Sequence, residues 1–369
     1  MPLDHLTFTR FLAALSVVIF HYGATTAPFD SSPTNAVFQA GPIAVSYFYA
    51  LSGFIMAIAY YQLANSSRKS NQQQQPIKIG KYWLARFARI YPVYLLALLL
   101  VFFANFQENR QAITALFLNI SLLQAWFSGY PLSLNSPGWS LSVEAFFYFC
   151  LPFLILFAYR FGKQSLLLVT IIIWIATQGL HTFLLNSPSY QAHNALHDFI
   201  YYHPLMHINT FLLGLMVGIY FKENYTLLRT NEISNRILLF LLVILIASLL
   251  MLQPHFPQLF GINIDFTNGL LAPLSLLFIV ILARDDSGFA QILAHPWLVL
   301  LGEASYSLYI LQRPAYGIYE KLIATPLAIP EFLSFYVYLL FLITLSIASF
   351  KLFETPARQL IRSWGNRYF

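Results

Sequence analysis

The sequence predicts an all-α membrane protein, a polytopic bundle of about ten transmembrane helices with both termini in the cytoplasm. Three observations lead to this fold class. The 369 residues are 58% hydrophobic and only 9% charged, whereas soluble domains are about 25% charged. Long apolar runs alternate with short polar segments. The basic residues gather in every second polar segment. A chain this apolar cannot bury its surface in one water-soluble core.

Ten apolar runs justify the count of spans. A helix that rises 1.5 Å per residue needs about 17–25 residues to cross roughly 30 Å of hydrocarbon, and each run meets or approaches this length. The runs cover roughly residues 6–22, 42–62, 90–106, 143–159, 165–185, 205–221, 236–252, 268–283, 297–320 and 332–353. An eleventh run, 111–127, is interrupted by Asn119, Ser121 and Gln124. We interpret it as a helix that lies on the membrane interface or dips into it.

The positions of lysine and arginine set the orientation. With ten spans and both ends inside, the loops on one side hold almost all the basic residues, and the opposite loops hold only Arg110 and Lys321. Cytoplasmic loops of membrane proteins carry such an excess, so we expect the basic side to be cytoplasmic. Anionic lipid head groups account for much of the net charge of +6. The basic character is therefore no reason to expect a nucleic-acid partner.

The domain organisation is expected to be simple. We predict one integral-membrane domain over residues 1–369, with a flexible cytoplasmic loop at about 63–80 that contains NSSRKSNQQQQ. The first 22 residues are not expected to be a cleaved signal peptide, because their start is not basic and Arg10 interrupts the apolar run. Cys150 is the only cysteine, which excludes an internal disulfide.

Arg10 and His21 both lie in the apolar stretch TRFLAALSVVIFHY (9–22). A charge at the bilayer centre costs about 2.5–3.5 kcal/mol on insertion scales, so each such residue needs a reason. Eleven residues are close to three helical turns, which places the two side chains on one face, roughly 16 Å apart along the axis. They can be an interfacial anchor and a hydrogen-bonded end residue, or they can line a path across the membrane.

Glu144 lies in SPGWSLSVEAFFYF (136–149), which opens the fourth predicted span. This position places Glu144 near the outer surface, at the expected depth of His21. A carboxylate bonded to one imidazole nitrogen fixes the tautomer and leaves the other nitrogen as a base. The alternative is a helix cap, in which Ser140 or Ser142 is the N-cap and Glu144 interacts with the helix dipole.

Two further groups of polar residues stand out. In KYWLARFARIYP (81–92), Arg86 and Arg89 are three residues apart on one helix face, and arginine pairs suit phosphate. A juxtamembrane lipid anchor explains them equally well. In the ninth span, polar side chains on adjacent turns predict a lined cavity; they are Tyr306, Ser307, Tyr309, Gln312 and Arg313.

The segment HNALHDFIYYHPLMH (193–207) contains two histidine pairs at helical i,i+4 spacing. Such pairs can bind zinc, but Pro204 breaks the register and no HExxH motif is present. We therefore expect no metal here and favour a solvated or substrate-facing outer loop. Its aromatic residues suit stacking against sugar rings, although aromatic belts at membrane interfaces explain them nearly as well.

Taken together, these motifs resemble membrane acyltransferase family 3, a family of acyl-CoA-dependent integral-membrane O-acyltransferases. The resemblance extends over essentially the whole chain. The matching residues are Arg10 with His21, SYFYALSGF (46–54), RFARIYP (86–92), GWSLSVEAFFY (138–148), YSLYILQRP (306–314) and FETPAR (353–358). The family motif commonly carries His at the position of Gln312, so the chain departs from the pattern there.

The resemblance implies transfer of an acyl group, usually acetyl, from cytoplasmic acyl-CoA to a hydroxyl, commonly on an extracytoplasmic or cell-surface glycan. It implies a multi-pass protein of the bacterial inner membrane. Arg10, Arg86 and Arg89 would bind the CoA phosphates. His21, assisted by Glu144, would act as general base in one step, or carry the acyl group in two steps. The residues expected to line the substrate path are Trp139, Ser140, Ser142, Tyr306, Ser307, Tyr309, Gln312 and Arg313.

The alternative is a transporter or flippase of a glycan-related small molecule. In that case the intramembrane charges would line a translocation path without chemistry. Broken half-helices at matching positions of two chain halves would favour transport, and the sequence contains no such pair.

Overall fold

The computed structural model describes residues 3–31, 34–62, 77–104, 110–225 and 232–368, and these residues form helices joined by turns, with no strand among them. The structure confirms the all-α polytopic membrane bundle. The longer helices are α1 (Asp4–Val18), α3 (Ile43–Tyr60), α4 (Ile79–Ala104), α5 (Arg110–Ile120), α6 (Trp139–Phe161), α7 (Lys163–Leu185), α9 (Pro204–Asn224), α10 (Glu232–Leu252), α12 (Ala272–Ala283), α14 (Pro296–Tyr319), α15 (Glu331–Ser349) and α16 (Thr355–Tyr368). The short ones are α2 (Thr34–Gln39), α8 (Ala195–Tyr202), α11 (Phe256–Phe260) and α13 (Gly288–Leu293).

Each of the ten predicted runs contains a helix. In the described part of the chain, eight helical stretches are long and apolar enough to cross a membrane. The other two runs correspond to α14, which carries Glu303 and Arg313, and to α12. The prediction of a span over 268–283 is too long, because α12 has only 12 residues and Gly269 turns the chain with a φ of +83°. The count of ten crossings therefore stays a prediction.

Two predicted boundaries are corrected. The third span was expected to start at residue 90, but α4 begins at Ile79 and continues through Pro92. The interrupted run 111–127 forms a helix only up to Ile120. There the backbone turns at Leu122 with a φ of +57°, and the buried Gln124 amide donates to the Gly138 carbonyl. Most of the loop predicted at 63–80 lies outside the described residues.

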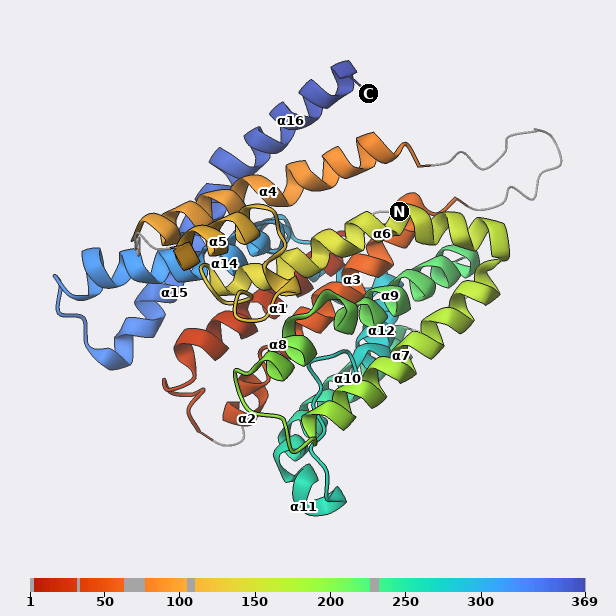
Figure 1. Cartoon of the computed structure of the whole chain (residues 1–369), viewed down its shortest axis with the longest axis horizontal. Helices are drawn as coiled ribbons and strands as arrows, with labels where there is room; N and C mark the ends of the chain where they lie inside the picture. The colour runs from red at the N-terminus through yellow and green to blue at the C-terminus, as the bar shows by residue number, and fades with distance from the viewer. Residues whose placement is uncertain (1–2, 32–33, 63–76, 105–109, 226–231, 369) are drawn as a thin grey trace.

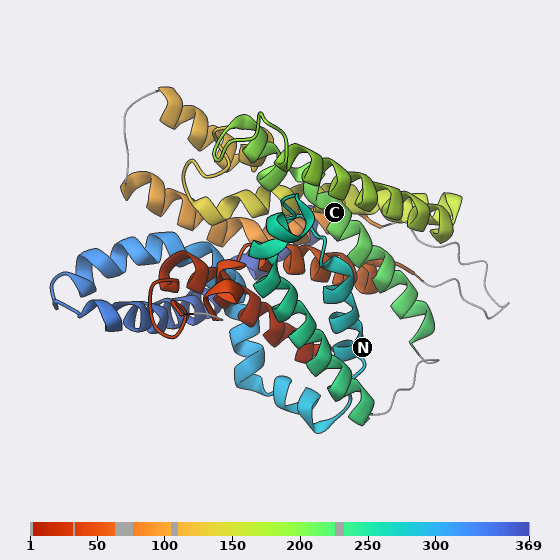
Figure 2. The ribbon, with the colours of Figure 1, turned by 90° about the horizontal axis from the view of Figure 1, so that it is seen from below.

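Helices α1 and α3 lie in the middle of the bundle, with α14 and α15 on one side and α7 and α9 on the other (Figures 1 and 2). The pair α3–α9 packs backbone against backbone. A Cβ on Gly53 would collide with the carbonyl oxygen of Phe211, and a Cβ on Gly214 with that of Ala50. Small residues allow helices in lipid to approach this closely, and van der Waals contact then holds them together.

Helix α1 packs along α14 in the same direction. Gly302 of α14 lies against the Thr7 carbonyl near the start of α1, and further along the pair His21 contacts Gln312. A π-helical turn, Ile19–Gly23, directly follows α1. Such turns are rare and frequently mark functional sites. This arrangement positions His21 beside α14.

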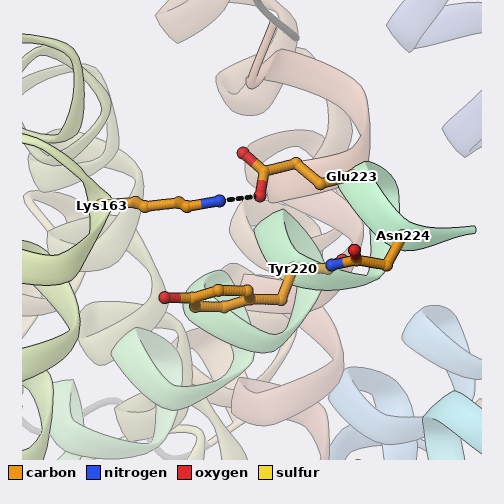
Figure 3. A network of polar contacts seen from close by, with 4 residues as sticks. All are labelled: Lys163, Tyr220, Glu223 and Asn224. Carbon is orange, nitrogen blue, oxygen red and sulfur yellow. Dashed lines mark hydrogen bonds and ion pairs between the residues drawn. The ribbon is translucent and has the colours of Figure 1, made fainter.

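The ends of α3, α6 and α9 meet the start of α7 at one end of the bundle. Lys163 forms an ion pair with Glu223, and its ammonium lies over the ring of Tyr220 (Figure 3). Lys222 donates to the backbone carbonyls of Ile58 and Tyr61, at 2.6 Å each. It thereby satisfies carbonyls that the end of α3 leaves without helical partners. The meeting of these helix ends fits the predicted alternation of the spans, and which side faces the cytoplasm stays a prediction.

Candidate active site

The bundle contains a cavity of about 110 Å³ between α1, α3, α4, α6 and α14. Its lining is largely aromatic and aliphatic, with charged groups from three different helices. They are Arg10 from α1, Arg89 from α4 and Glu144 from α6. A cavity that gathers ionisable groups within an apolar bundle is a candidate for function, because each of these groups is costly to place in lipid.

The charges at the cavity form one electrostatic cluster. The guanidinium of Arg10 interacts with the carboxylates of Glu303 and Glu144 and with the like charge of Arg89. Arg89 interacts with the same two carboxylates. The hydroxyl of Tyr148, one turn along α6, donates to Glu144. Glu144 therefore offsets part of the positive charge that Arg10 and Arg89 bring into the bundle.

The expected pairing of Glu144 with His21 is not what the structure shows. Glu144 is bonded to Tyr148 and lines the cavity with Arg10, whereas the hydrogen bond described for His21 goes to Gln312. The reason is the start of the helix. A 3₁₀ turn at Ser136–Gly138 leads directly into α6 at Trp139, so Glu144 lies in the second turn, deeper than a span beginning at 143 would place it.

The capping alternative for Glu144 is also wrong. The N-cap of α6 is Gly138, no side chain caps the helix, and its first turn contains no acidic residue. Ser140 instead donates to the Pro137 carbonyl and accepts a hydrogen bond from Tyr309. Ser142 donates to the Leu122 carbonyl.

His21 is held by Gln312. The Nδ1 atom of His21 lies 2.8 Å from Oε1 of Gln312, and Nε2 of the same amide donates to the Tyr309 carbonyl at 2.7 Å. A carbonyl only accepts, so this second bond fixes which end of the amide faces the imidazole. Oε1 of Gln312 can only accept as well. Nδ1 of His21 therefore carries the proton, and Nε2 of His21 keeps its lone pair. The buried amide thus selects the tautomer in which the exposed His21 ring is a base at Nε2.

The polar residues predicted to line a cavity in the ninth span, which is α14, do not all face the same part of the protein. Tyr306 and Tyr309 line the cavity. Ser307 faces α15 and the end of the chain, and its hydroxyl donates to Glu354. Gln312 faces His21, and Arg313 is not part of the cavity lining. Helix α14 therefore connects the cavity to His21 through Tyr309, whose side chain lines the cavity and whose carbonyl accepts from Gln312.

Two more predicted site residues lie next to the cavity rather than in its lining. Arg86 donates to the hydroxyl of Tyr60 at 3.3 Å, and its guanidinium lies over the rings of Tyr60 and Tyr148. Trp139 packs against the rings of Tyr202 and His207. Arg86 is therefore close to the charge cluster, whereas Trp139 belongs to the aromatic layer between α6, α8 and α9.

The sequence interpretation noted Glu354 as an ionisable residue near the end of a span but gave it no role in the site. Its side chain is 3% exposed, accepts from Ser307 at 3.1 Å, and interacts electrostatically with Arg89 and Arg10. The segment FETPAR, already matched to the family, was the available signal. Glu354 lies in a π-helical turn, Phe350–Glu354, which joins α15 to α16.

The histidine-rich segment 193–207 uses its polar groups within the protein. Nδ1 of His197 lies 3.0 Å from the Tyr190 hydroxyl, and Nε2 of His207 lies 2.9 Å from the Tyr201 carbonyl. Asp198 accepts from the Ser128 hydroxyl. Among the residues that the structure describes, no three His, Cys, Asp or Glu side chains are grouped to hold a metal ion.

Comparison with known proteins gives one family and several relatives. A family model described as "Acyltransferase domain" matches residues 4–351. Acyltransferase MdmB of Streptomyces mycarofaciens is 30% identical over 161 residues, 41% of this chain and 38% of that protein. O-acetyltransferase OatA of Staphylococcus aureus is 24% identical over 377 residues, 95% of this chain and 56% of that protein. The chain thus spans about half the length, or less, of these two relatives. No solved structure matches it.

Proposed function

The chain belongs to the acyltransferase family whose domain model matches residues 4–351, and on this premise we propose that it is an integral-membrane O-acyltransferase. It moves an acyl group, in our proposal acetyl, from cytoplasmic acyl-CoA to a hydroxyl of an extracytoplasmic or cell-surface carbohydrate. The family and the relatives named O-acetyltransferase and acyltransferase support the reaction class. The donor, the acceptor, the direction across the membrane and a location in the bacterial inner membrane are parts of the proposal.

The observation that carries the proposal is the bond between His21 and Gln312. An O-acyl transfer needs a group that accepts the proton of the attacking hydroxyl. The 2.8 Å contact from Nδ1 of His21 to Oε1 of Gln312 leaves Nε2 in the basic form. A histidine kept merely for packing would not need a buried amide whose orientation is fixed by a second hydrogen bond.

Three arginines at or beside the cavity suit the phosphates of the acyl donor. Arg10 is eleven residues before His21 on the same helix, roughly 16 Å away by helix rise. Arg10 and Arg89 line the cavity, and Arg86 lies beside it. Guanidinium groups bind phosphate through charge and paired hydrogen bonds. In our proposal the phosphates of CoA meet these arginines, and the flexible acyl-bearing arm extends through the cavity toward His21.

The chemistry follows from this placement. Nε2 of His21 takes the proton from the acceptor hydroxyl while the hydroxyl oxygen attacks the thioester carbonyl carbon. The carbon–sulfur bond breaks, and the imidazolium returns the proton to the leaving thiolate. In the two-step version, Nε2 attacks the thioester first and the thiolate leaves and takes up a proton from solvent. The acceptor oxygen then displaces the imidazole and releases a proton.

Glu144 takes a different role from the one expected at first. Its contacts with Tyr148 and the charges of Arg10 and Arg89 make it the counter-charge of the donor arginines. We propose that it holds these guanidiniums in place for phosphate binding. His21 is oriented by Gln312 instead.

The direct test uses the purified full chain in lipid nanodiscs with acetyl-CoA labelled in the acetyl group. We expect CoA release and transfer of label to a carbohydrate acceptor, and loss of both in His21→Ala, which removes the base. Mass spectrometry of surface glycans from a deletion strain identifies the acceptor. Binding of acetyl-CoA without any release of CoA, together with uptake of a glycan precursor into proteoliposomes, would support the transporter alternative instead.

A further inference from the structure

We propose that the C-terminal helix α16 is part of the donor site and that Arg358 and Arg362 bind the 3′-phosphate at the nucleotide end of CoA. The inference rests on the proposed function, because it names further residues for the same donor. It concerns a segment that follows the last predicted span, and the four arginine side chains that two helices bring together there.

Helix α16 lies beside the first half of α4 (Figure 1). The contact is close at Gly365, which is buried, and where any Cβ would collide with the side chain of Leu84. Arg362 lies about one turn before Gly365, and Arg86 lies two residues after Leu84. The packing of the two helices therefore brings the basic residues of α16 next to those of α4.

The four arginines of this contact form a cluster of like charge. The guanidinium of Arg362 interacts with those of Arg358, Arg86 and Arg89. Among the described residues, none of the four is in an ion pair. Glu354 interacts with both Arg89 and Arg358, and Glu303 and Glu144 interact with Arg89.

Such a cluster is unfavourable without an anion. Unit charges of the same sign repel one another, and the repulsion grows where the surroundings are less polar than water. The carboxylates of Glu303, Glu144 and Glu354 offset Arg89, whereas the charges that act on Arg362 are all positive. A doubly charged phosphate would offset these positive charges, and each guanidinium can offer it two parallel N–H donors.

The positions of the arginines between the cavity and the surface indicate which phosphate of CoA each of them binds. Arg89 lines the cavity, Arg358 is half-buried, and Arg362 is exposed. The cluster thus leads from the cavity to the surface. In CoA the thioester is at one end, the diphosphate is in the middle, and the 3′-phosphate is on the ribose at the other end. When the thioester points to His21, the diphosphate falls at Arg86 and Arg89, and the 3′-phosphate at Arg358 and Arg362.

The test compares CoA with dephospho-CoA, which lacks only the 3′-phosphate. Dissociation constants are measured by calorimetry on the full chain in nanodiscs of neutral phosphatidylcholine. We expect unmodified protein to bind CoA about tenfold or more tightly than dephospho-CoA, the usual effect of a charged hydrogen-bonded contact. Arg362→Ala and Arg358→Ala should weaken CoA binding by a similar factor and bind both ligands alike. Arg362→Lys should restore part of the difference, because it keeps the charge.

Matched controls separate this effect from damage to the fold. Arg160 is an exposed arginine at the end of α6, and its guanidinium lies over the ring of Phe161. Arg160→Ala should leave both dissociation constants unchanged. Thermal unfolding of every variant checks integrity. If Arg362→Ala and Arg358→Ala keep the preference of the unmodified protein for CoA, the inference is wrong.

Phosphate head groups of anionic lipid have the same chemistry, so a second arm repeats the measurement in nanodiscs with phosphatidylglycerol. A gain in thermal stability from phosphatidylglycerol that disappears in the two variants, with CoA binding unaffected, would assign the arginines to lipid and overturn the inference. Failure of the unmodified protein to bind CoA at all would overturn the proposed donor itself. The two failures are therefore distinguishable.

Discussion

Nδ1 of His21 lies 2.8 Å from Oε1 of Gln312, although 291 residues separate them in the chain. The contact joins the π-helical turn after α1 to α14. It fixes the imidazole tautomer through an uncharged amide, where a carboxylate had been expected. An amide orients the ring without adding a negative charge beside it, so any positive charge that forms on His21 has no carboxylate partner at this contact.

The first prediction concerns Gln312. Gln312→Leu keeps the approximate size of the side chain but removes the acceptor for Nδ1 of His21, so the tautomer is no longer selected. We expect kcat to fall by about 10²-fold or more, within the usual range for general-base catalysis. Gln312→Glu keeps an acceptor and should retain more activity. The measurement is turnover of labelled acetyl-CoA in membranes with matched expression.

Gln178→Leu is the control for that change. Gln178 of α7 donates to the Asn268 carbonyl, in the turn before α12, at 2.8 Å. This is a glutamine amide bonded to a backbone carbonyl, away from the cavity. Normal turnover in Gln312→Leu would remove the argument for His21 as an oriented base.

The second prediction concerns Glu144. Glu144→Gln removes the charge that offsets Arg10 and Arg89 but keeps the size of the side chain. If the carboxylate positions the donor arginines, the KM for acyl-CoA should rise, and kcat at saturating donor should change less. Steady-state kinetics with varied donor distinguish the roles. A fall in kcat alone, with unchanged donor KM, would favour the role first expected from the sequence, assistance to His21.

The third prediction concerns the donor arginines of α4. Arg89→Ala should raise the KM for acyl-CoA by about tenfold, because it removes a charged phosphate contact, and it should affect the KM for the acceptor less. Arg86→Ala should act in the same direction. An unchanged donor KM in a well-expressed double variant would leave these two residues as lipid anchors.

Much of this could be predicted from the sequence, for physical reasons. Apolar composition and the distribution of charge govern insertion into lipid, so the helical bundle and the positions of its spans follow from local patterns. The spacing of Arg10 and His21 on one helix is equally local. The limits of α4 and α12 were missed, because helical hydrogen bonding can continue past an apolar run or stop within it, and hydropathy does not measure it.

The partners within the site could not be predicted in this way. Glu144 was assigned to the wrong neighbour because the start of α6 was placed four residues late, and a shift of one turn changes the depth of a side chain by about 5 Å. Gln312 was expected only to line the substrate path, since a contact between two helices far apart in the chain leaves no trace in local spacing. Such pairings depend on how whole helices pack.

The fourth prediction tests the packing of α3 against α9. Gly214→Ala places a Cβ against the Ala50 carbonyl, so the helices must separate, and we expect a loss of about 1–3 kcal/mol of stability, as for other overpacked contacts. Thermal unfolding in detergent is the measurement. Gly179→Ala is the matched control, because a Cβ there meets no atom within 4 Å. Equal stability of the two variants would contradict the contact.

The fifth prediction concerns topology. Reporters fused after Gln72, which lies outside the described residues, and after Asn366 should both give a cytoplasmic signal, because the basic residues gather on that side. A fusion after Arg110 should give an extracytoplasmic signal. An external signal from either of the first two fusions would overturn the sides assigned to donor and acceptor.

The glycine contact between α3 and α9 also limits how the protein can move. Gly53 and Gly214 each face a backbone carbonyl of the other helix. Sliding α3 by one turn would bring Tyr49, four residues before Gly53, into the space that this glycine now leaves open. Rocking of one half against the other, on which many transporters depend, would meet the same obstacle if the boundary ran between these helices. The contact therefore opposes sliding of α3 along α9. In the proposed reaction the protein stays still while the acyl-bearing arm travels.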